Sequence, residues 1–183
     1  MIDLVTGAES QILQGFDDPV HYLVFSPDSS RLLGVDNGSR LKIWDRATGR
    51  ETAATRLSDV YIVRIRYSAD GKRLAVVGFQ HQGSVGDIRV LDAQTGRELA
   101  ALKGHTLLVG DADFSPDGQR LATCSVDRTV RLWDLASGQE ILTLRGHTRP
   151  VGSVRFISDG NHLISASGDR TVRIWDATPL PEH

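Results

Sequence analysis

The sequence of 183 residues predicts an all-β protein, and two observations carry that prediction. The stretch G-H-T-L-L-V-G-D-A-D-F, which begins at Gly104, returns at Gly146 as G-H-T-R-P-V-G-S-V-R-F, 42 positions later. Within each unit, short runs of alternating apolar and polar residues are separated by turn-forming residues, which is typical of β-strands. No segment shows sustained helical periodicity. We therefore expect a single domain over residues 1–183, built from repeated β units.

Two sequence features recur along the chain with the same spacing. An aromatic residue precedes the first turn of each unit, and its intervals are 42, 47 and 42: Phe25, Tyr67, Phe114 and Phe156. An aspartate closes the third strand of each unit, and its intervals are 42, 47, 42 and 42: Asp3, Asp45, Asp92, Asp134 and Asp176. Because both features agree, the repeat is not a chance match. The expected repeats cover about 9–50, 51–97, 98–139 and 140–178.

Each unit should hold four strands, here called a to d. Strand a alternates, as in Val151 to Phe156. In the turn Ser115-Pro116-Asp117-Gly118, proline presets its own backbone angle and glycine accepts a positive one. Strand b follows as an apolar run, and strand c is β-branched and aromatic, as strands prefer. In the third unit, strands b, c and d are 121–125, 129–133 and 140–144.

A period of ~40–45 residues marked by Gly-His and Trp-Asp is typical of a four-stranded propeller blade. On these residues the chain resembles the WD-repeat β-propeller family over almost its whole length. The resemblance implies a β-propeller built of four-stranded antiparallel blades, with four blades in this chain. It also implies a non-enzymatic scaffold that mediates protein-protein interaction.

The two ends of the chain raise the question of ring closure. Gln11 to Gln14 reads as a strand d without its own a, b and c. The strand c that ends at Trp175 is followed by prolines, which disfavour another ladder strand. The resemblance implies that the first strand completes the last blade. Three arrangements stay open: a small ring closed by one chain, a part of a larger propeller, and a homodimer that forms one eight-bladed ring. Open sheet edges are an aggregation hazard, so some closure is expected, and strand exchange in a dimer would supply it.

A histidine, a carboxylate, a hydroxyl and a tryptophan recur in the last two units. Such a set could be a general base held by a carboxylate, or a His/Asp metal site. An active site is seldom copied from unit to unit, however, and the resemblance implies a structural hydrogen-bonded tetrad in each blade. We therefore expect no catalytic residue and no metal site. The expected tetrads, with Ser125 and Ser167 as alternative hydroxyls, are His105, Thr123, Asp127, Trp133 and His147, Ser165, Asp169, Trp175.

The first two units depart from this pattern. Phe16 and Ser58 stand where the histidines stand, Gly38 stands at the position of Asp127, and Leu91 replaces a tryptophan. We expect these two blades to depend more on apolar packing and to be the less stable half of the protein.

The second unit carries five extra residues within 78–86, between strands b and c. Its three glycines predict a flexible hairpin with accessible side chains at Phe79 and His81, either as a tolerated surface insertion or as a partner-contacting loop. The hairpin should share one rim with the loops from strand d to strand a. Exposed aromatic, aliphatic and arginine side chains are typical of interfaces. The candidate partner-binding residues are Tyr61, Phe79, His81, Leu107, Leu108 and Arg149.

Composition narrows the function further. The formal net charge is −2 and basic residues are not clustered, which argues against nucleic acid and anionic membranes as partners. The one cysteine, Cys124, allows no intrachain disulfide. We find neither a signal-peptide pattern nor an apolar run long enough for a membrane helix, so a cytoplasmic location is expected. No G-x-S-x-G elbow, phosphate loop or zinc motif is present, and no cofactor is expected.

Three functions follow. We expect a non-enzymatic scaffold that binds a protein or peptide on the rim face of the propeller. The first alternative is an interaction or sensor segment of a larger signalling protein that contains a kinase or NTPase domain. The second is a propeller enzyme that uses the central channel, which would require polar residues outside the repeat pattern to converge there.

Overall fold

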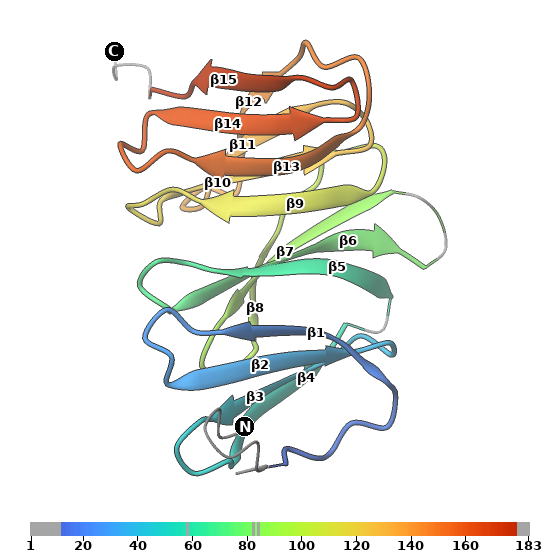
Figure 1. The fold of residues 1–183 in the computed structure, drawn as a ribbon, viewed down its shortest axis with the longest axis vertical. Helices are drawn as coiled ribbons and strands as arrows, with labels where there is room; N and C mark the ends of the chain where they lie inside the picture. Colours follow the sequence, from blue (N-terminus) through green and yellow to red (C-terminus); the bar gives the residue numbers. More distant parts are fainter. Residues whose placement is uncertain (1–11, 58, 82, 84, 179–183) are drawn as a thin grey trace.

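The structure is a computed structural model that describes residues 12–57, 59–81, 83 and 85–178. Every regular element within these residues is a β-strand, and the strands form four separate antiparallel sheets (Figure 1). The prediction of an all-β fold is confirmed. Strands that are neighbours in the sequence are also neighbours in each sheet, so every connection within a sheet is a hairpin.

We number the sheets from 1 to 4 in chain order. Sheet 1 contains β1 (Val20–Phe25), β2 (Arg31–Asp36), β3 (Arg40–Asp45) and β4 (Glu51–Arg56). Sheet 2 contains β5 (Val60–Tyr67), β6 (Arg73–Gln80), β7 (Gly86–Asp92) and β8 (Glu98–Ala101). Sheet 3 contains β9 (Val109–Phe114), β10 (Arg120–Ser125), β11 (Val130–Asp134) and β12 (Glu140–Leu144). Sheet 4 contains β13 (Val151–Phe156), β14 (His162–Ser167) and β15 (Val172–Asp176).

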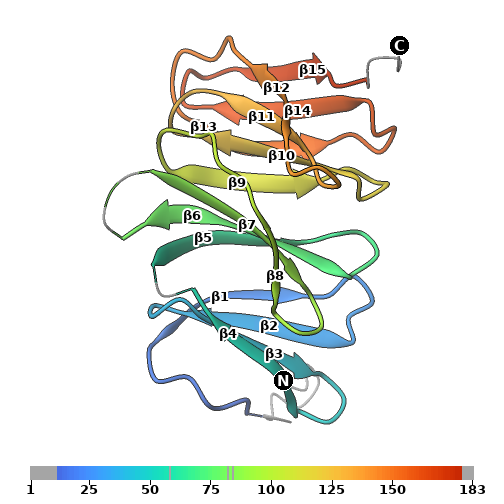
Figure 2. The same cartoon turned by 180° about the vertical axis from the view of Figure 1, so that it is seen from behind.

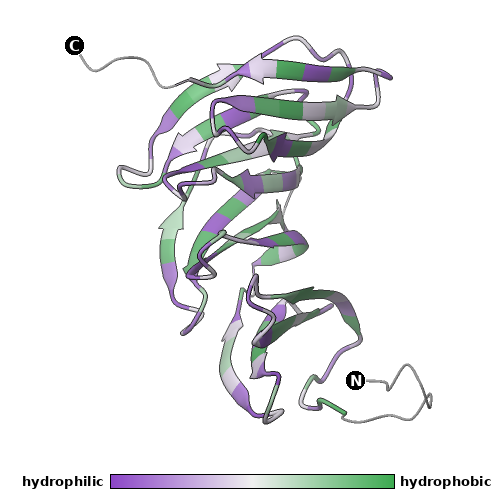
Figure 3. Cartoon of the chain, turned by 60° about the vertical axis from the view of Figure 1, so that its left-hand side comes forward, coloured by the Kyte–Doolittle hydropathy of each residue, from purple (hydrophilic) through white to green (hydrophobic). Residues whose placement is uncertain are grey.

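The four sheets are stacked face to face along an arc, with sheets 1 and 4 at opposite ends (Figures 1 and 2). The first strand of each sheet, namely β1, β5, β9 and β13, follows the first strand of the preceding sheet along one side of the stack. Figure 3 shows each sheet rotated relative to its neighbour. This is the blade arrangement of a β-propeller, and four blades in one chain agree with the sequence prediction.

The described residues do not show the first strand of the chain completing the last sheet of the same chain. Gln11 lies outside them, and Ile12 to Gln14 belong to no strand. A few residues later, the ring of Phe16 packs on Trp44 in sheet 1, which holds this part of the chain at the opposite end of the arc from β15. Within the described residues, sheet 4 therefore ends at β15.

The core lies between the sheets because each interior sheet buries both of its faces. Ile43 of sheet 1 and Ile65 of sheet 2 belong to one buried cluster, and the other two junctions hold similar clusters. The middle strand of sheet 3, β10, is buried along its whole length. Strands that are covered on both faces read as apolar runs rather than as strict alternation, which is the pattern that the sequence shows here.

A repeated polar contact also joins neighbouring sheets. At the start of the second strand, an arginine donates to the carbonyl of a glycine in the first turn of the next sheet. The glycine has a positive φ in each case. The three pairs and their distances are Arg31–Gly71 at 3.0 Å, Arg73–Gly118 at 2.9 Å and Arg120–Gly160 at 2.7 Å.

Candidate interaction face

One edge of the arc is built from two sets of loops, and we call it the rim. In every sheet, the turn between the second and third strands donates a backbone hydrogen bond to the loop that leads into the first strand. These bonds confirm that the two loops lie together, as expected from the sequence. The donor and acceptor pairs are Asn37 to Pro19, His81 to Asp59, Val126 to Leu108 and Gly168 to Pro150, all at 3.0 Å.

Three rings are stacked on this rim, and we call His21, Tyr61 and Phe79 the aromatic row. The ring centroids of Tyr61 and Phe79 are 5.2 Å apart with an interplanar angle of 29°. Those of His21 and Tyr61 are 6.0 Å apart with an angle of 19°. Tyr61 and Phe79 face each other on the adjacent strands β5 and β6, whereas His21 comes from β1 of sheet 1. The row therefore crosses the junction between two sheets.

Sequence reasoning missed His21 because it lies in a strand rather than in a loop. Its imidazole Nε2 lies 3.2 Å from the carbonyl oxygen of Ile62, which fixes the ring beside Tyr61. The available signal was that the first strand begins with a ring-bearing side chain in two successive units, at His21 and at Tyr61.

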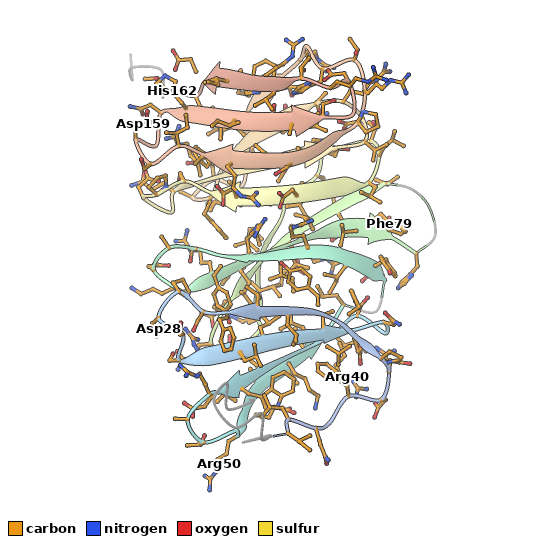
Figure 4. All side chains as sticks on the ribbon, viewed as in Figure 1. Asp28, Arg40, Arg50, Phe79, Asp159 and His162 are labelled. Atoms are coloured by element: carbon orange, nitrogen blue, oxygen red, sulfur yellow. The ribbon has the colours of Figure 1, made fainter. Side chains whose placement is uncertain are left out.

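The inserted residues form a longer hairpin rather than a long flexible loop. Strand β6 has 8 residues and β7 has 7, whereas β10 and β11 of sheet 3 have 6 and 5. Phe79 lies inside β6 and is half-buried because it stacks on Tyr61, so its predicted accessibility holds only in part (Figure 4). His81, in the turn, is exposed.

Two glycines of this hairpin serve close packing, which corrects their predicted role in flexibility. A Cβ atom on Gly78 would lie 1.9 Å from the carbonyl oxygen of Tyr61. A Cβ atom on Gly86 would lie 2.5 Å from the carbonyl oxygen of Leu107 in the next loop. Both positions exclude a side chain because backbone atoms occupy the space.

The remaining candidates for partner binding lie further along the rim. Leu107 is exposed and Leu108 is half-buried, both in the loop before β9. Arg149 is exposed in the loop before β13. The contact with Gly86 places Leu107 beside the long hairpin, whereas no described contact connects Arg149 with the aromatic row. The structure therefore brings together Tyr61, Phe79 and their neighbours, and leaves Arg149 apart.

The four tetrad residues of sheet 3 form one continuous chain of hydrogen bonds. The indole Nε1 of Trp133 donates to Thr123 Oγ1 over 2.8 Å. The imidazole of His105 has Nε2 2.9 Å from the same hydroxyl oxygen and Nδ1 2.8 Å from Asp127 Oδ2. These distances fit a single direction of donation, in which tryptophan donates to threonine, threonine to Nε2, and Nδ1–H to the carboxylate. Both imidazole nitrogens are then engaged, and His105 is buried.

The same chain occurs in sheet 4. Trp175 Nε1 donates to Ser165 Oγ over 2.8 Å, and His147 lies 2.8 Å from both Ser165 Oγ and Asp169 Oδ2. The alternative hydroxyls, Ser125 and Ser167, donate instead to carbonyls of the rim loops, at Leu107 and Arg149.

The carboxylate of Asp127 has further donors around it. Thr129 donates through its hydroxyl over 2.6 Å, and the amide of Thr106 donates over 3.1 Å. Burial raises the pKa of Asp127, but the hydrogen bonds from His105 and Thr129 outweigh it and hold the pKa well below its usual range. The carboxylate is therefore charged at neutral pH, where it accepts these hydrogen bonds.

Sheets 1 and 2 have ion pairs near the positions that the tetrads occupy in sheets 3 and 4. In sheet 1, Arg40 forms an ion pair with Asp17. In sheet 2, Arg89 pairs with Asp87 at 2.8 Å, Asp59 at 2.9 Å and Glu98 at 3.3 Å. This cluster borders a cavity of about 330 Å³ between β7, β8 and the loop that ends at His105.

A second polar cluster lies on the inner strands and breaks the repeat pattern. Asp111 of β9 is 1% exposed and contacts Arg155 of β13 at 2.6 Å, and Arg66 and Arg64 of β5 at 3.3 and 3.5 Å. Ser153 of β13 donates to it as well, over 3.2 Å. The cluster joins three sheets through one carboxylate. Sequence reasoning missed it, because these arginines alternate with apolar residues and lie far apart in the sequence.

No group of three or more His, Cys, Asp or Glu side chains among the described residues is arranged to hold a metal ion. The same residues contain no helix with the length and apolar character needed to cross a membrane.

The stacked antiparallel sheets and the repeated tetrads define a protein built from propeller blades. The family model described as "WD domain, G-beta repeat" matches residues 7–45, 96–134 and 138–176, which is more than half of the chain. The chain belongs to this WD-repeat family, whose domains are typical scaffolds for protein-protein interaction. The second unit lies largely outside the three matches, and it is the unit that has Ser58 and Leu91 in place of histidine and tryptophan.

Known proteins resemble this chain over different lengths. A guanine nucleotide-binding protein subunit beta from Solanum tuberosum is 29% identical over 75 residues, which are 41% of this chain and 20% of that protein. The structure of U3-55K is 26% identical with a TM-score of 0.76, over 91% of this chain and 51% of the other. The crystal structure of the RRP9 WD40 repeats gives the same identity and TM-score, over 90% and 50%. The chain thus spans a fifth of the plant relative and about half of each solved structure.

Proposed function

We propose that this protein is a non-enzymatic scaffold that binds a protein or peptide through the rim, with the aromatic row at the centre of the binding surface. The observation that carries the proposal is the stacking of His21, Tyr61 and Phe79 across the junction of two sheets. Tyr61 is 37% exposed, so part of its ring faces solvent while the rest is supported by its neighbours.

Physical chemistry favours such a row as a binding surface. Aromatic rings supply a large apolar contact area, and they are enriched among the residues that dominate binding energy. Because the three rings already support one another, their side chains lose little conformational entropy when a partner binds. His81 and Asp59 are exposed beside the row and offer polar contacts at its edge.

The similar proteins also support a protein partner. The plant relative is described as a subunit of a guanine nucleotide-binding protein, and a subunit acts in an assembly. Nucleic acid and membranes are not part of the proposal. A cytoplasmic location stays a prediction.

One alternative is supported by a specific observation. The chain spans about half of each similar solved structure, which is expected if it is an interaction segment of a larger protein. A link to a kinase or NTPase domain stays a prediction. The enzyme alternative requires polar groups that converge on the inner strands. The cluster at Asp111 is such a group, but its described charges are paired with one another, which favours a structural role.

The test begins with affinity capture and mass spectrometry to identify a partner. Binding to the purified partner is then measured for the parent and for the double variant Tyr61→Ala, Phe79→Ala. We expect the double variant to bind at least about tenfold more weakly, a loss of about 1.4 kcal/mol. Circular dichroism checks that the variant is folded.

The matched control is Ile141→Ala, since Ile141 is 50% exposed but lies in β12 and not in the rim loops. This variant should bind as the parent does. Equal binding by the parent and the folded double variant would show that the aromatic row is not the binding surface.

A further inference from the structure

We propose that two copies of this chain close into one ring, in which each copy covers both end faces of the other. The trailing face is the outer side of sheet 4, where Ile164, Val172 and Ile174 are 36%, 67% and 68% exposed. The leading face is the outer side of sheet 1, where Leu23 and Phe25 are 61% and 50% exposed. Several exposed apolar side chains gathered on one face of a sheet are typical of an interaction surface.

The trailing face consists of positions that are buried elsewhere in the arc. Val172 and Ile174 of β15 occupy the repeat positions of Val130 and Leu132 in β11. Those two residues are 0% and 3% exposed, because sheet 4 covers them. The outer side of sheet 4 is therefore equivalent to the side of sheet 3 that sheet 4 covers. No described residues cover the outer side of sheet 4.

The leading face shows the same relation in the opposite direction. Leu23 and Phe25 of β1 occupy the repeat positions of Ala112 and Phe114 in β9. Those residues are 0% and 6% exposed, because they pack on sheet 2. Every junction inside the arc therefore joins one trailing face to one leading face. The free trailing face of one copy fits the free leading face of another in the same way.

The match between the two end faces indicates a second copy as the occupant, because a second copy carries the face that each free face fits. The four sheets superpose on about half of each similar solved structure, with a TM-score of 0.76. Two such arcs joined head to tail would meet at two equivalent junctions related by a two-fold axis. A closed pair leaves neither apolar end face in solvent.

The open edge of β15 carries a basic residue at a position that forms an ion pair in the other sheets. In sheets 1 to 3, a basic residue of the third strand pairs with an acid nine positions later in the fourth strand: Lys42–Glu51, Arg89–Glu98 and Arg131–Glu140. In sheet 4 the corresponding residue is Arg173, and the acid nine positions later, Glu182, lies outside the described residues. Its guanidinium lies over the ring of Trp175, 5.7 Å from the centroid.

The first test measures the molar mass of the 183-residue chain by light scattering during size exclusion. We expect twice the 20.0 kDa of a single chain. Ile174→Asp on the trailing face and Leu23→Asp on the leading face should each give a monomer, because each variant alters both junctions. The control Ile141→Asp changes an equally apolar exposed residue away from the end faces, and it should remain a dimer.

A mixture of the two monomeric variants is the decisive measurement. One of the two junctions in a mixed pair contains neither aspartate, so the mixture should recover the dimer mass although each variant alone does not. This recovery also shows that both variants are folded. If either variant loses its circular dichroism spectrum, the milder Ile174→Thr and Leu23→Thr replace it, and each should raise the dissociation constant of the dimer at least tenfold.

Two results would overturn the proposal. A monomeric parent chain would mean that something other than a second copy covers the end faces, such as the remainder of a longer protein. A dimer that survives Leu23→Asp or Leu23→Thr unchanged would mean that two trailing faces pair with each other. Neither result depends on the rim, so the proposed function is tested separately.

Discussion

The ring of Phe16 meets the indole of Trp44 edge-on, with the centroids 5.4 Å apart and an interplanar angle of 68°. The imidazole of His105 meets Trp133 in nearly the same way, at 6.4 Å and 63°. Sheet 1 thus keeps the shape of the tetrad with a phenyl ring in place of the imidazole. The other two partners of the imidazole are absent as well, because Gly34 and Gly38 stand where Thr123 and Asp127 stand. The histidine, the hydroxyl and the carboxylate of the tetrad are thus replaced together, and only the tryptophan is kept.

Restoring only the histidine in sheet 1 should therefore be harmful. We expect Phe16→His to lower the free energy of unfolding by about 1–3 kcal/mol, because glycines face both ring nitrogens and offer no side-chain partner. Phe16→Leu loses the ring pair but buries no polar group, so it should cost less. Urea denaturation of both variants measures the difference. Equal stability of Phe16→His and the parent would contradict this account.

The tetrad of sheet 3 should contribute to stability as one unit. His105→Ala and Asp127→Ala should each cost about 1–3 kcal/mol, because each leaves buried polar partners unpaired. The double variant should cost less than both single losses added together, since the first substitution already breaks the chain. Thr106→Ala is the control, because only the backbone amide of Thr106 contacts Asp127. Thermal or chemical unfolding measures all four variants, and parent-like stability of both single variants would show that the tetrad is not structural.

The charge of Asp127 predicts a dependence of stability on pH. Its pKa is lowered in the folded protein, so its stabilising contribution is complete above the usual aspartate pKa of about 4 and is lost as the pH falls toward the lowered value. Between pH 7 and pH 3, the free energy of unfolding should fall more steeply for the parent than for Asp127→Asn. Other carboxylates affect both proteins alike, so the difference isolates Asp127. Parallel curves would argue against a charged carboxylate in the tetrad.

The close approach at Gly78 predicts a strong effect of a single methyl group. Gly78→Ala should destabilise the protein by about 1–3 kcal/mol, because the carbonyl of Tyr61 lies where the Cβ would be and backbone atoms cannot move aside. Gly152→Ala is the matched control in a strand, since nothing lies within 4 Å of its Cβ position. The two variants should differ clearly in melting temperature, and similar values would mean that β5 and β6 can separate without cost.

Cys124 should be unreactive in the native protein. Its thiol is buried between sheets 3 and 4, and burial raises its pKa, so little thiolate forms near neutral pH. A thiol reagent should label it only slowly in native buffer and completely in denaturant. Rapid native labelling would indicate that these two sheets open readily.

The fold was largely predictable because its signals are local and repeated. The aromatic residue before the first turn and the aspartate after the third strand locate four copies of one hairpin unit, and the structure has four such sheets. Tetrad partners such as His105 and Asp127 also keep the same spacing in the last two repeats. Their proximity therefore follows once the strands are assigned.

The aromatic row and the Asp111 cluster could not be predicted in the same way. Both depend on how neighbouring sheets face each other, which the repeat pattern does not specify. His21 reaches Tyr61 across one such junction, and Arg155 reaches Asp111 across another. The role of Gly78 was misjudged for a related reason, because a sequence shows that a side chain is missing but not what occupies its space.

The cluster at Asp111 also has a mechanical consequence. A single buried carboxylate holds arginines from β5 on one side and β13 on the other, so sheets 2, 3 and 4 cannot rotate relative to one another without stretching an ion pair. The Asp111 cluster lies on the inner strands of the arc, and these strands would separate if the arc became flatter. Each chain would then keep its bend before it meets another molecule, and little conformational freedom would be lost when a ring is assembled.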